Sequence, residues 1–239
     1  MKIIAVGPYI GDFETEITSF RPYVVWHYCN EKFDRFYISS HSERAFLYHW
    51  VPCENFIPVR KDLICKSQKC YFNEAIDHNQ YLKLVRKFRN DIYNMSTDVE
   101  KEDIKIFSPA YTKLADPVHY NKKLFTSIKV EHEFQGFILF EDEVYFDKYT
   151  YRRLSEIESY EEKIAAICSA KILICEAGIW TVIANMQKVP VFSWSEGAIG
   201  KYKEGGEFNF GNKNMIIYSD NQKTMLKTME NYLKQMMGY

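Results

Sequence analysis

The chain has 239 residues, of which 46% are hydrophobic, and its 31 Lys and Arg against 32 Asp and Glu give a formal net charge of −1. This length is enough for one large globular domain or for two of about 120 residues. The balanced charge argues against a nucleic-acid partner, which needs a local excess of Lys and Arg, and no apolar stretch approaches the roughly 20 residues of a membrane-spanning helix.

Cysteine usage indicates a reducing compartment and no metal site. Six cysteines in a chain of this length predict no disulfide framework. Cys65 and Cys70 are separated by four residues instead of the two that are typical of zinc knuckles, and no second Cys/His pair has ligand spacing. No apolar segment typical of a secretory leader precedes Gly7. We therefore expect structural thiols in a cytoplasmic protein.

The N-terminal half alternates short strands with helical patterns. Runs rich in β-branched and aromatic residues predict strands at residues 2–6, 36–39, 56–59 and 104–107. Helical patterns run from about residue 12 to 20, from 42 to 50 and from 79 to 94. The first strand leads into a loop that contains Gly7, Gly11 and Asp12. This alternation predicts an α/β domain.

The C-terminal half has the same alternation. Strands are predicted at residues 137–140, 171–175, 189–194 and 215–218, and helices from Ser155 or Ser159, at 178–187 and at 222–237. Ser159 and Glu162 have the spacing of a capping box. The segment Ala115-Asp116-Pro117 is the candidate boundary, which gives an N-terminal domain at 1–117 and a C-terminal domain at 118–239.

Residues 168–194 give the most informative pattern in the chain. Two apolar runs that are too short for helices flank a segment of about three helical turns, as in a parallel βαβ unit. The turn Glu176-Ala177-Gly178 would then join the carboxyl end of a strand to the amino end of a helix. Free backbone N–H groups and the helix dipole favour phosphate at this edge. A purely structural βαβ unit is the alternative interpretation.

Taken together, the two halves predict an α/β protein with two Rossmann-like doubly wound domains and a central cleft for ligands. The loop at Gly11 and Asp12 would face the turn around Gly178 across that cleft.

These motifs resemble glycosyltransferases of the two-Rossmann GT-B architecture, and within them the heptosyltransferase type (glycosyltransferase family 9). The strand, loop, Gly11-Asp12 and helix are similar to the family's N-terminal Gly-Asp, whose aspartate is the proposed general base. The segment 170–184 with Val189-Pro190-Val191 is similar to the family's motif around the nucleotide diphosphate. Here Glu176, Ala177 and Thr181 stand where the family has Asp, Ser and His.

The resemblance implies metal-independent inverting transfer of a sugar from a nucleotide-sugar, which is a co-substrate, so that no further cofactor is expected. Asp12 would be the catalytic base; its alternative role is the N-cap of the first helix. Glu176 would bond a ribose hydroxyl or cap its own turn, and Lys201 would close over the diphosphate. The implied donor-binding residues are Gly11, Glu176, Gly178, Ile179, Trp180, Thr181 and Lys201.

Two other functions stay open. The altered motif and the short second half favour a non-catalytic binding or regulatory protein on a reduced GT-B scaffold. The architecture also hosts nucleotide-sugar epimerases and hydrolases. For a transferase, the acceptor would be a glycan, a lipid-linked saccharide or the hydroxyl of a modified nucleobase.

Overall fold

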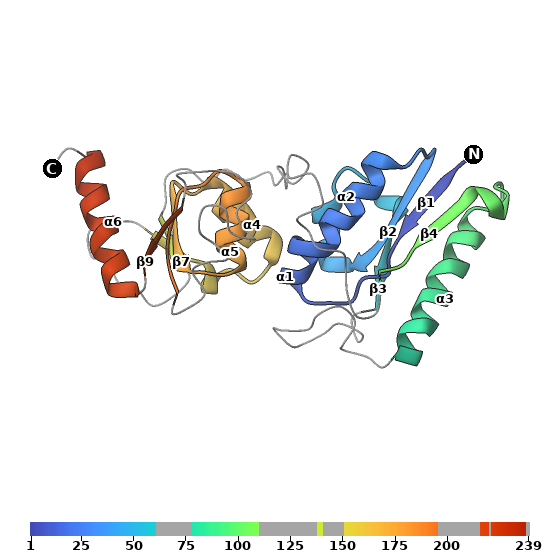
Figure 1. Cartoon of the computed structure of the whole chain (residues 1–239), viewed down its shortest axis with the longest axis horizontal. Coiled ribbons are helices and arrows are strands. Elements are labelled where there is room, and N and C mark those ends of the chain that lie inside the picture. The colour runs from blue at the N-terminus through green and yellow to red at the C-terminus, as the bar shows by residue number, and fades with distance from the viewer. Residues whose placement is uncertain (61–77, 110–137, 141–150, 196–215, 220, 238–239) are drawn as a thin grey trace. The chain divides into compact units, whose positions relative to one another are not determined.

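The computed structural model describes residues 1–60, 78–109, 138–140, 151–195, 216–219 and 221–237 (Figure 1). The chain divides into two compact units, Met1–Leu124 and Phe125–Tyr239. Each unit contains a parallel β-sheet with helices, so the fold is α/β as predicted. Several residues singled out from the sequence lie outside the described part: Cys65, Cys70, Ala115, Asp116, Pro117 and Lys201.

The first unit is built on a four-stranded parallel sheet with the order β3-β2-β1-β4. Its strands are β1 (Ile3–Val6), β2 (Arg35–His41), β3 (Phe56–Val59) and β4 (Ile104–Phe107). β1 is central, and its Ile3 is the register partner of Arg35 on one side and Ile104 on the other. All four residues of β1 are buried, because helices cover both faces of a parallel sheet.

The helices of the first unit lie on both faces of this sheet, with α2 and α3 on opposite sides (Figure 1). The segments are α1 (Phe13–Thr15), the π-helical turn η1 (Glu16–Phe20), α2 (Arg21–Asn30), the 3₁₀ turns η2 (Ser42–Tyr48), η3 (Cys53–Asn55) and η5 (Lys101–Asp103), and α3 (His78–Met95). The helix α3 packs through Phe88 and Ile92 on Ile3, Ala5 and Ile104. This contact buries one apolar face of the predicted helix near its C-terminal end.

The second unit is built on a five-stranded parallel sheet with the order β6-β5-β7-β8-β9. Its strands are β5 (Ile138–Phe140), β6 (Tyr151–Arg153), β7 (Ile172–Glu176), β8 (Val191–Trp194) and β9 (Ile216–Ser219). The strands β7 and β8 pair in parallel from Leu173 with Val191 to Glu176 with Trp194. The predicted parallel βαβ unit is therefore confirmed.

Helices cover both faces of the second sheet as well (Figure 1). The segments are the 3₁₀ turn η8 (Leu154–Glu156), α4 (Tyr160–Ser169), α5 (Ile179–Met186) and α6 (Gln222–Met237). The helix α6 buries Met225, Met229 and Leu233 against a sheet face that includes Phe192 and Trp194. The apolar face of α6 is therefore part of the core, and α4 and α5 lie on the other face of the sheet (Figure 1).

Three expectations about secondary structure were wrong. The first helix continues to Asn30 instead of ending near Phe20, because Pro22 lies in the first turn of α2, directly after the π-helical turn, where a proline is tolerated. Residues 42–48 form 3₁₀ turns and not an α-helix. The strand β6 was missed, since Tyr151-Arg152-Arg153 has no apolar pattern.

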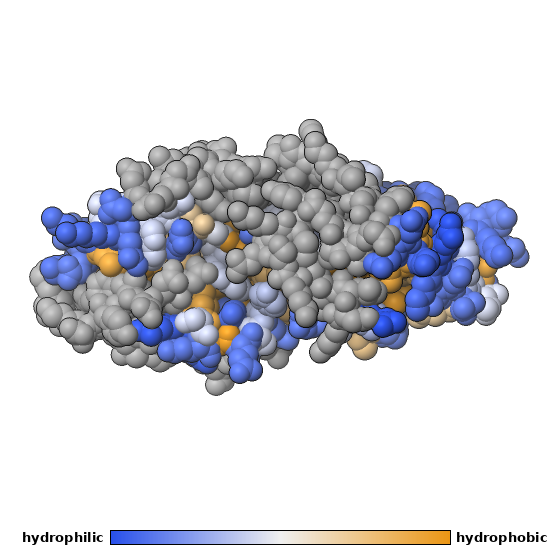
Figure 2. Space-filling model, turned by 90° about the horizontal axis from the view of Figure 1, so that it is seen from below, coloured by the Kyte–Doolittle hydropathy of each residue, from blue (hydrophilic) through white to orange (hydrophobic). Residues whose placement is uncertain are grey.

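The surface of the described residues is mainly hydrophilic on the face shown in Figure 2, with hydrophobic residues in small patches. Large hydrophobic side chains that are exposed in the described part of the chain are Met1, Trp26 and Met95. The helices among these residues include none that is long and apolar enough to cross a membrane.

Candidate functional site

The loop after β1 is buried, and packing accounts for both of its glycines. Gly7 has φ +136°, and a Cβ there would lie 2.7 Å from the carbonyl oxygen of Ser39. A Cβ on Gly11 would lie 2.7 Å from Cζ of Tyr9. The hydroxyl of Tyr9 donates to the backbone carbonyl of Asp12 over 2.8 Å, so the ring is fixed against Gly11.

Asp12 is the N-cap of α1. Its Oδ1 accepts a hydrogen bond from the backbone N–H of Thr15 at 2.7 Å, and its Oδ2 accepts one from the Thr15 hydroxyl at 3.1 Å. Burial raises the pKa of Asp12 above its ordinary value, and the bonds from Thr15 and the charge of Arg44 lower it in part. The capping role is thus confirmed, and the role as a base stays a prediction.

Behind this loop lies a buried ion pair between Glu16 and Arg44. Glu16 is 0% exposed at its side chain and Arg44 4%, and an Nη of Arg44 lies 2.7 Å from Oε2 of Glu16. The same carboxylate accepts hydrogen bonds from the Tyr48 hydroxyl at 2.7 Å and from the hydroxyl of Ser40. Three donors around one carboxylate offset the cost of burying its charge.

The network reaches the loop through the carbonyl oxygen of Gly11. Arg44 and Nε2 of His41 both lie 3.0 Å from this oxygen. Since a carbonyl only accepts, Nε2 must carry the proton. Burial and then the charge of Arg44 lower the pKa of His41 to about 4, so the ring is neutral at pH 7. Arg44 and His41 therefore fix the backbone that immediately precedes Asp12.

In the second unit, the turn after β7 carries the predicted donor-binding residues. Glu176 ends the strand and is exposed, and the N–H of Ala177 donates to the carbonyl of Trp194 at 2.8 Å. The Thr181 hydroxyl is buried inside the turn, where it accepts from the N–H of Gly178 and donates to the carbonyl of Glu176, both at 3.4 Å. Thr181 thus holds the turn through its side chain.

Gly178 is the N-cap of α5 and has no conformational reason to be glycine. Its φ of −171° and ψ of −157° are extended backbone that any residue adopts. A Cβ at this position would meet no described atom within 4 Å. The N–H groups in the first turn of an α-helix generally have no acceptor within the helix. Together with the helix dipole they favour an anion in the open space beside Gly178.

Lys163 adds a positive charge to this end of α5. Its Nζ lies 5.7 Å from the ring centroid of Trp180 and 6.0 Å from that of Tyr160. Trp180 is 8% exposed and is the second residue of α5. The sequence carries no signal for Lys163, because a lysine in a helical pattern is ordinarily a solvated surface residue.

Among the described residues, no three His, Cys, Asp or Glu side chains lie close enough together to hold a metal ion. The expectation of metal-free chemistry stays a prediction. Comparisons of the chain with protein-family models, curated proteins and solved structures give no match.

Proposed function

We propose that the chain is a glycosyltransferase that moves a sugar from a nucleotide-sugar donor to an acceptor hydroxyl by metal-independent inverting transfer. The observation that carries the proposal is Gly178. It is a glycine at the amino end of a helix and the carboxyl end of a parallel strand, where neither backbone angles nor packing require one. Close approach of a diphosphate to the backbone is the reason that such a position favours glycine.

The order of the strands supports two Rossmann-like domains of the GT-B kind. In open α/β sheets, ligands bind beyond the carboxyl ends of the strands where the strand order reverses. The order β3-β2-β1-β4 reverses beside β1, and the order β6-β5-β7-β8-β9 reverses between β5 and β7. The strand β1 leads into the loop of Gly11 and Asp12, and β7 leads into the turn of Gly178. Both loops chosen from the sequence therefore follow a strand at a reversal point.

For the donor, we propose that the diphosphate lies against the first turn of α5. The N–H groups of Ile179, Trp180 and Thr181 and the ammonium of Lys163 would stabilise the negative charge that develops as the nucleoside diphosphate departs. Such stabilisation takes the place of a metal ion. Glu176 is exposed beside this turn, which suits a hydrogen bond to a ribose hydroxyl.

For the acceptor, we propose that Asp12 is the general base. Its carboxylate would take the proton of the acceptor hydroxyl while that oxygen bonds to the anomeric carbon and the bond to the diphosphate oxygen breaks. The raised pKa of Asp12 supports this role, because it makes the carboxylate a stronger base than an ordinary aspartate. The network of Glu16, Arg44 and His41 would hold the loop in place.

A non-catalytic binding or regulatory protein is the second candidate, and one observation favours it. Both oxygens of Asp12 already accept hydrogen bonds from Thr15. A capping carboxylate has a complete structural role without any catalysis. An epimerase or hydrolase on the same scaffold is the third.

Fluorine NMR of fluorotryptophan-labelled protein tests the donor site. The chain has four tryptophans, and Trp180 lies in the first turn of α5. Titration with UDP, GDP, ADP, CMP and their sugar conjugates should shift the Trp180 signal for one nucleoside diphosphate, with or without EDTA.

Gly178→Ala should weaken that binding about tenfold or more and lower the urea midpoint only slightly, since the new methyl group has room and only the preference for glycine over alanine at an N-cap is lost. Ser169→Ala is the matched control. Ser169 is the last residue of α4, at the end of this helix away from Lys163, so this variant should bind the nucleotide normally. Absence of any nucleotide response, or unchanged affinity in Gly178→Ala, would overturn the donor site.

Asp12→Asn separates the enzyme from the binding protein, because asparagine is an equally good N-cap but no base. The measurement is release of the nucleoside diphosphate from the nucleotide-sugar that the NMR titration identifies as the ligand. A transferase should lose this turnover in Asp12→Asn and keep nucleotide affinity and stability. Nucleotide binding without turnover in the unsubstituted protein would instead support the non-catalytic scaffold.

A further inference from the structure

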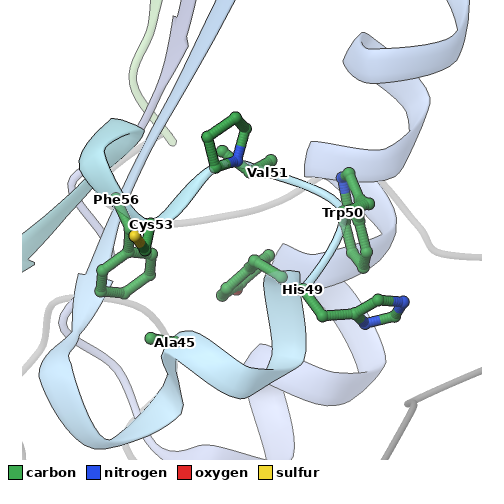
Figure 3. Close-up of a pocket in the computed structure, with 8 residues that line it drawn as sticks. Ala45, His49, Trp50, Val51, Cys53 and Phe56 are labelled. Carbon is green, nitrogen blue, oxygen red and sulfur yellow. The ribbon is translucent and has the colours of Figure 1, made fainter.

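We propose that the first unit contains a second small-molecule site, which binds an uncharged planar aromatic ring. The site is a cavity of about 530 Å³ formed by the end of η2, the loop that follows it and the start of β3 (Figure 3). This volume lies within the range of about 300–1,000 Å³ typical of ligand pockets. The proposal is independent of the proposed transferase activity.

The cavity lies two strands away from the loop of Gly11 and Asp12. Phe56, which lines the cavity, is the first residue of β3 and pairs with Ile38 of β2, and Ile38 pairs with Val6, the last residue of β1. The start of β3 is therefore level with the end of β1, and Tyr48 of the cavity donates to Glu16 of the network behind the loop. The cavity is thus a neighbour of the proposed catalytic region, and Trp50 reports on it separately from Trp180 at the proposed donor site.

Aromatic side chains form the walls of the cavity. Tyr48 lies with its ring centroid 5.8 Å from that of Trp50 at an interplanar angle of 68°, and 6.1 Å from that of Phe56 at 30°. Figure 3 shows Trp50 and Phe56 on opposite sides, with Ala45 below and Val51 above. The three rings therefore pack on one another, and an aromatic ligand in the cavity would extend this cluster.

Buried polar groups hold two of these walls in place without a ligand. The hydroxyl of Tyr48 donates to Glu16. The guanidinium of Arg21 lies 5.1 Å from the ring centroid of Trp50, and its Nε donates to the carbonyl of Leu47 at 3.1 Å. Arg21 is 1% exposed, so this arrangement is fixed from inside the unit. A cavity with preformed walls binds without the cost of ordering them.

The lining also determines the charge of the ligand. None of the side chains around the cavity is Asp, Glu, Lys or Arg. The exposed His49 and Cys53 lie at its rim. A charged group inside would lose its hydration without a compensating charge, whereas a neutral ring with one polar substituent can turn that substituent to the rim. Phenol has this chemistry, and cyclohexanol has the same polar group on a ring that is neither planar nor aromatic.

The test is titration of the fluorotryptophan-labelled full chain with phenol and, separately, with cyclohexanol. Trp50→Phe assigns the Trp50 signal. Phenol should shift Trp50 in a saturable way and leave Trp194 of the second unit unchanged, and cyclohexanol should shift neither. An absent Trp50 response to phenol, or an equal response to cyclohexanol, would overturn the proposal.

Two variants locate the site. Ala45→Phe should fill the cavity and weaken phenol binding about tenfold or more. Phe56→Leu keeps most of the volume, removes one aromatic wall and should weaken phenol binding even if Ala45→Phe does not fold. Unchanged phenol affinity in Phe56→Leu, or in folded Ala45→Phe, would place phenol elsewhere and refute the assignment.

Discussion

The buried ion pair of Glu16 and Arg44 makes a sharp prediction about stability. Arg44→Met removes one partner and leaves the carboxylate of Glu16, 0% exposed, with only the hydroxyls of Ser40 and Tyr48 as donors. Loss of one partner of a buried pair typically costs about 3–5 kcal/mol, because a charge then stays buried without compensation. We expect a loss of this size in the first unit.

A double-mutant cycle distinguishes this charge effect from simple loss of packing. Glu16→Gln should also destabilise, since Arg44 then keeps its charge without the carboxylate. In the double variant Glu16→Gln with Arg44→Met, no charge of the pair is left buried. The double variant should therefore be more stable than the sum of the single losses predicts, by about 2 kcal/mol or more.

The assay is urea unfolding followed by fluorine NMR of the tryptophans. Trp26 and Trp50 report on the first unit, and Trp180 and Trp194 report on the second. Lys87→Met is the matched control, because Lys87 and Asp91 form an exposed ion pair with 67% and 31% of their side chains accessible. Its loss should not exceed about 0.5 kcal/mol. If Arg44→Met costs no more than the control, or if the cycle is additive, the charge argument fails.

The remaining predictions concern acid stability and the loop after β1. Burial lowers the pKa of His27 to about 4, and burial with the charge of Arg44 does the same for His41. Between pH 6.5 and 4 the unfolded chain therefore binds more protons at these histidines than the folded chain does. Each histidine should lower the free energy of unfolding by about 2 kcal/mol at pH 5 relative to pH 7. A urea midpoint that does not fall on acidification would contradict this. Gly11→Ala should destabilise the first unit by about 1–3 kcal/mol, because the methyl group clashes with the fixed ring of Tyr9. An unchanged midpoint in this variant would show that the ring can move aside.

Most of the strands could be predicted because they are short runs rich in β-branched and aromatic residues. Residues 56–59 and 104–107 are strands with the predicted bounds. The helix at 222–237 was likewise predictable from its apolar spacing. The strand Tyr151–Arg153 could not be predicted, because it gains its order from pairing with β5 and not from its own residues.

The polar network was outside the reach of the sequence. Glu16 and Arg44 are 28 residues apart, and each lies in a segment with a helical pattern, where charged residues are ordinarily solvated. Only the packing of η2 against η1 brings them together. The N-cap role of Asp12 was predictable from its position before a helix. The cleft expected between the two domains stays a prediction.

The glycines at the two reversal points have different physical explanations, and this difference decides where a ligand should be sought first. Gly7 has a positive φ that favours glycine, and at Gly11 a side chain would overlap the ring of Tyr9. The fold alone therefore accounts for both glycines. Gly178 has extended backbone that any residue adopts and open space where its Cβ would be, so neither angles nor crowding requires glycine, which is also an accepted N-cap residue. The proposed close approach of a diphosphate would make use of the missing side chain there. The second unit is therefore the one whose nucleotide binding would carry the functional argument, whatever role Asp12 has.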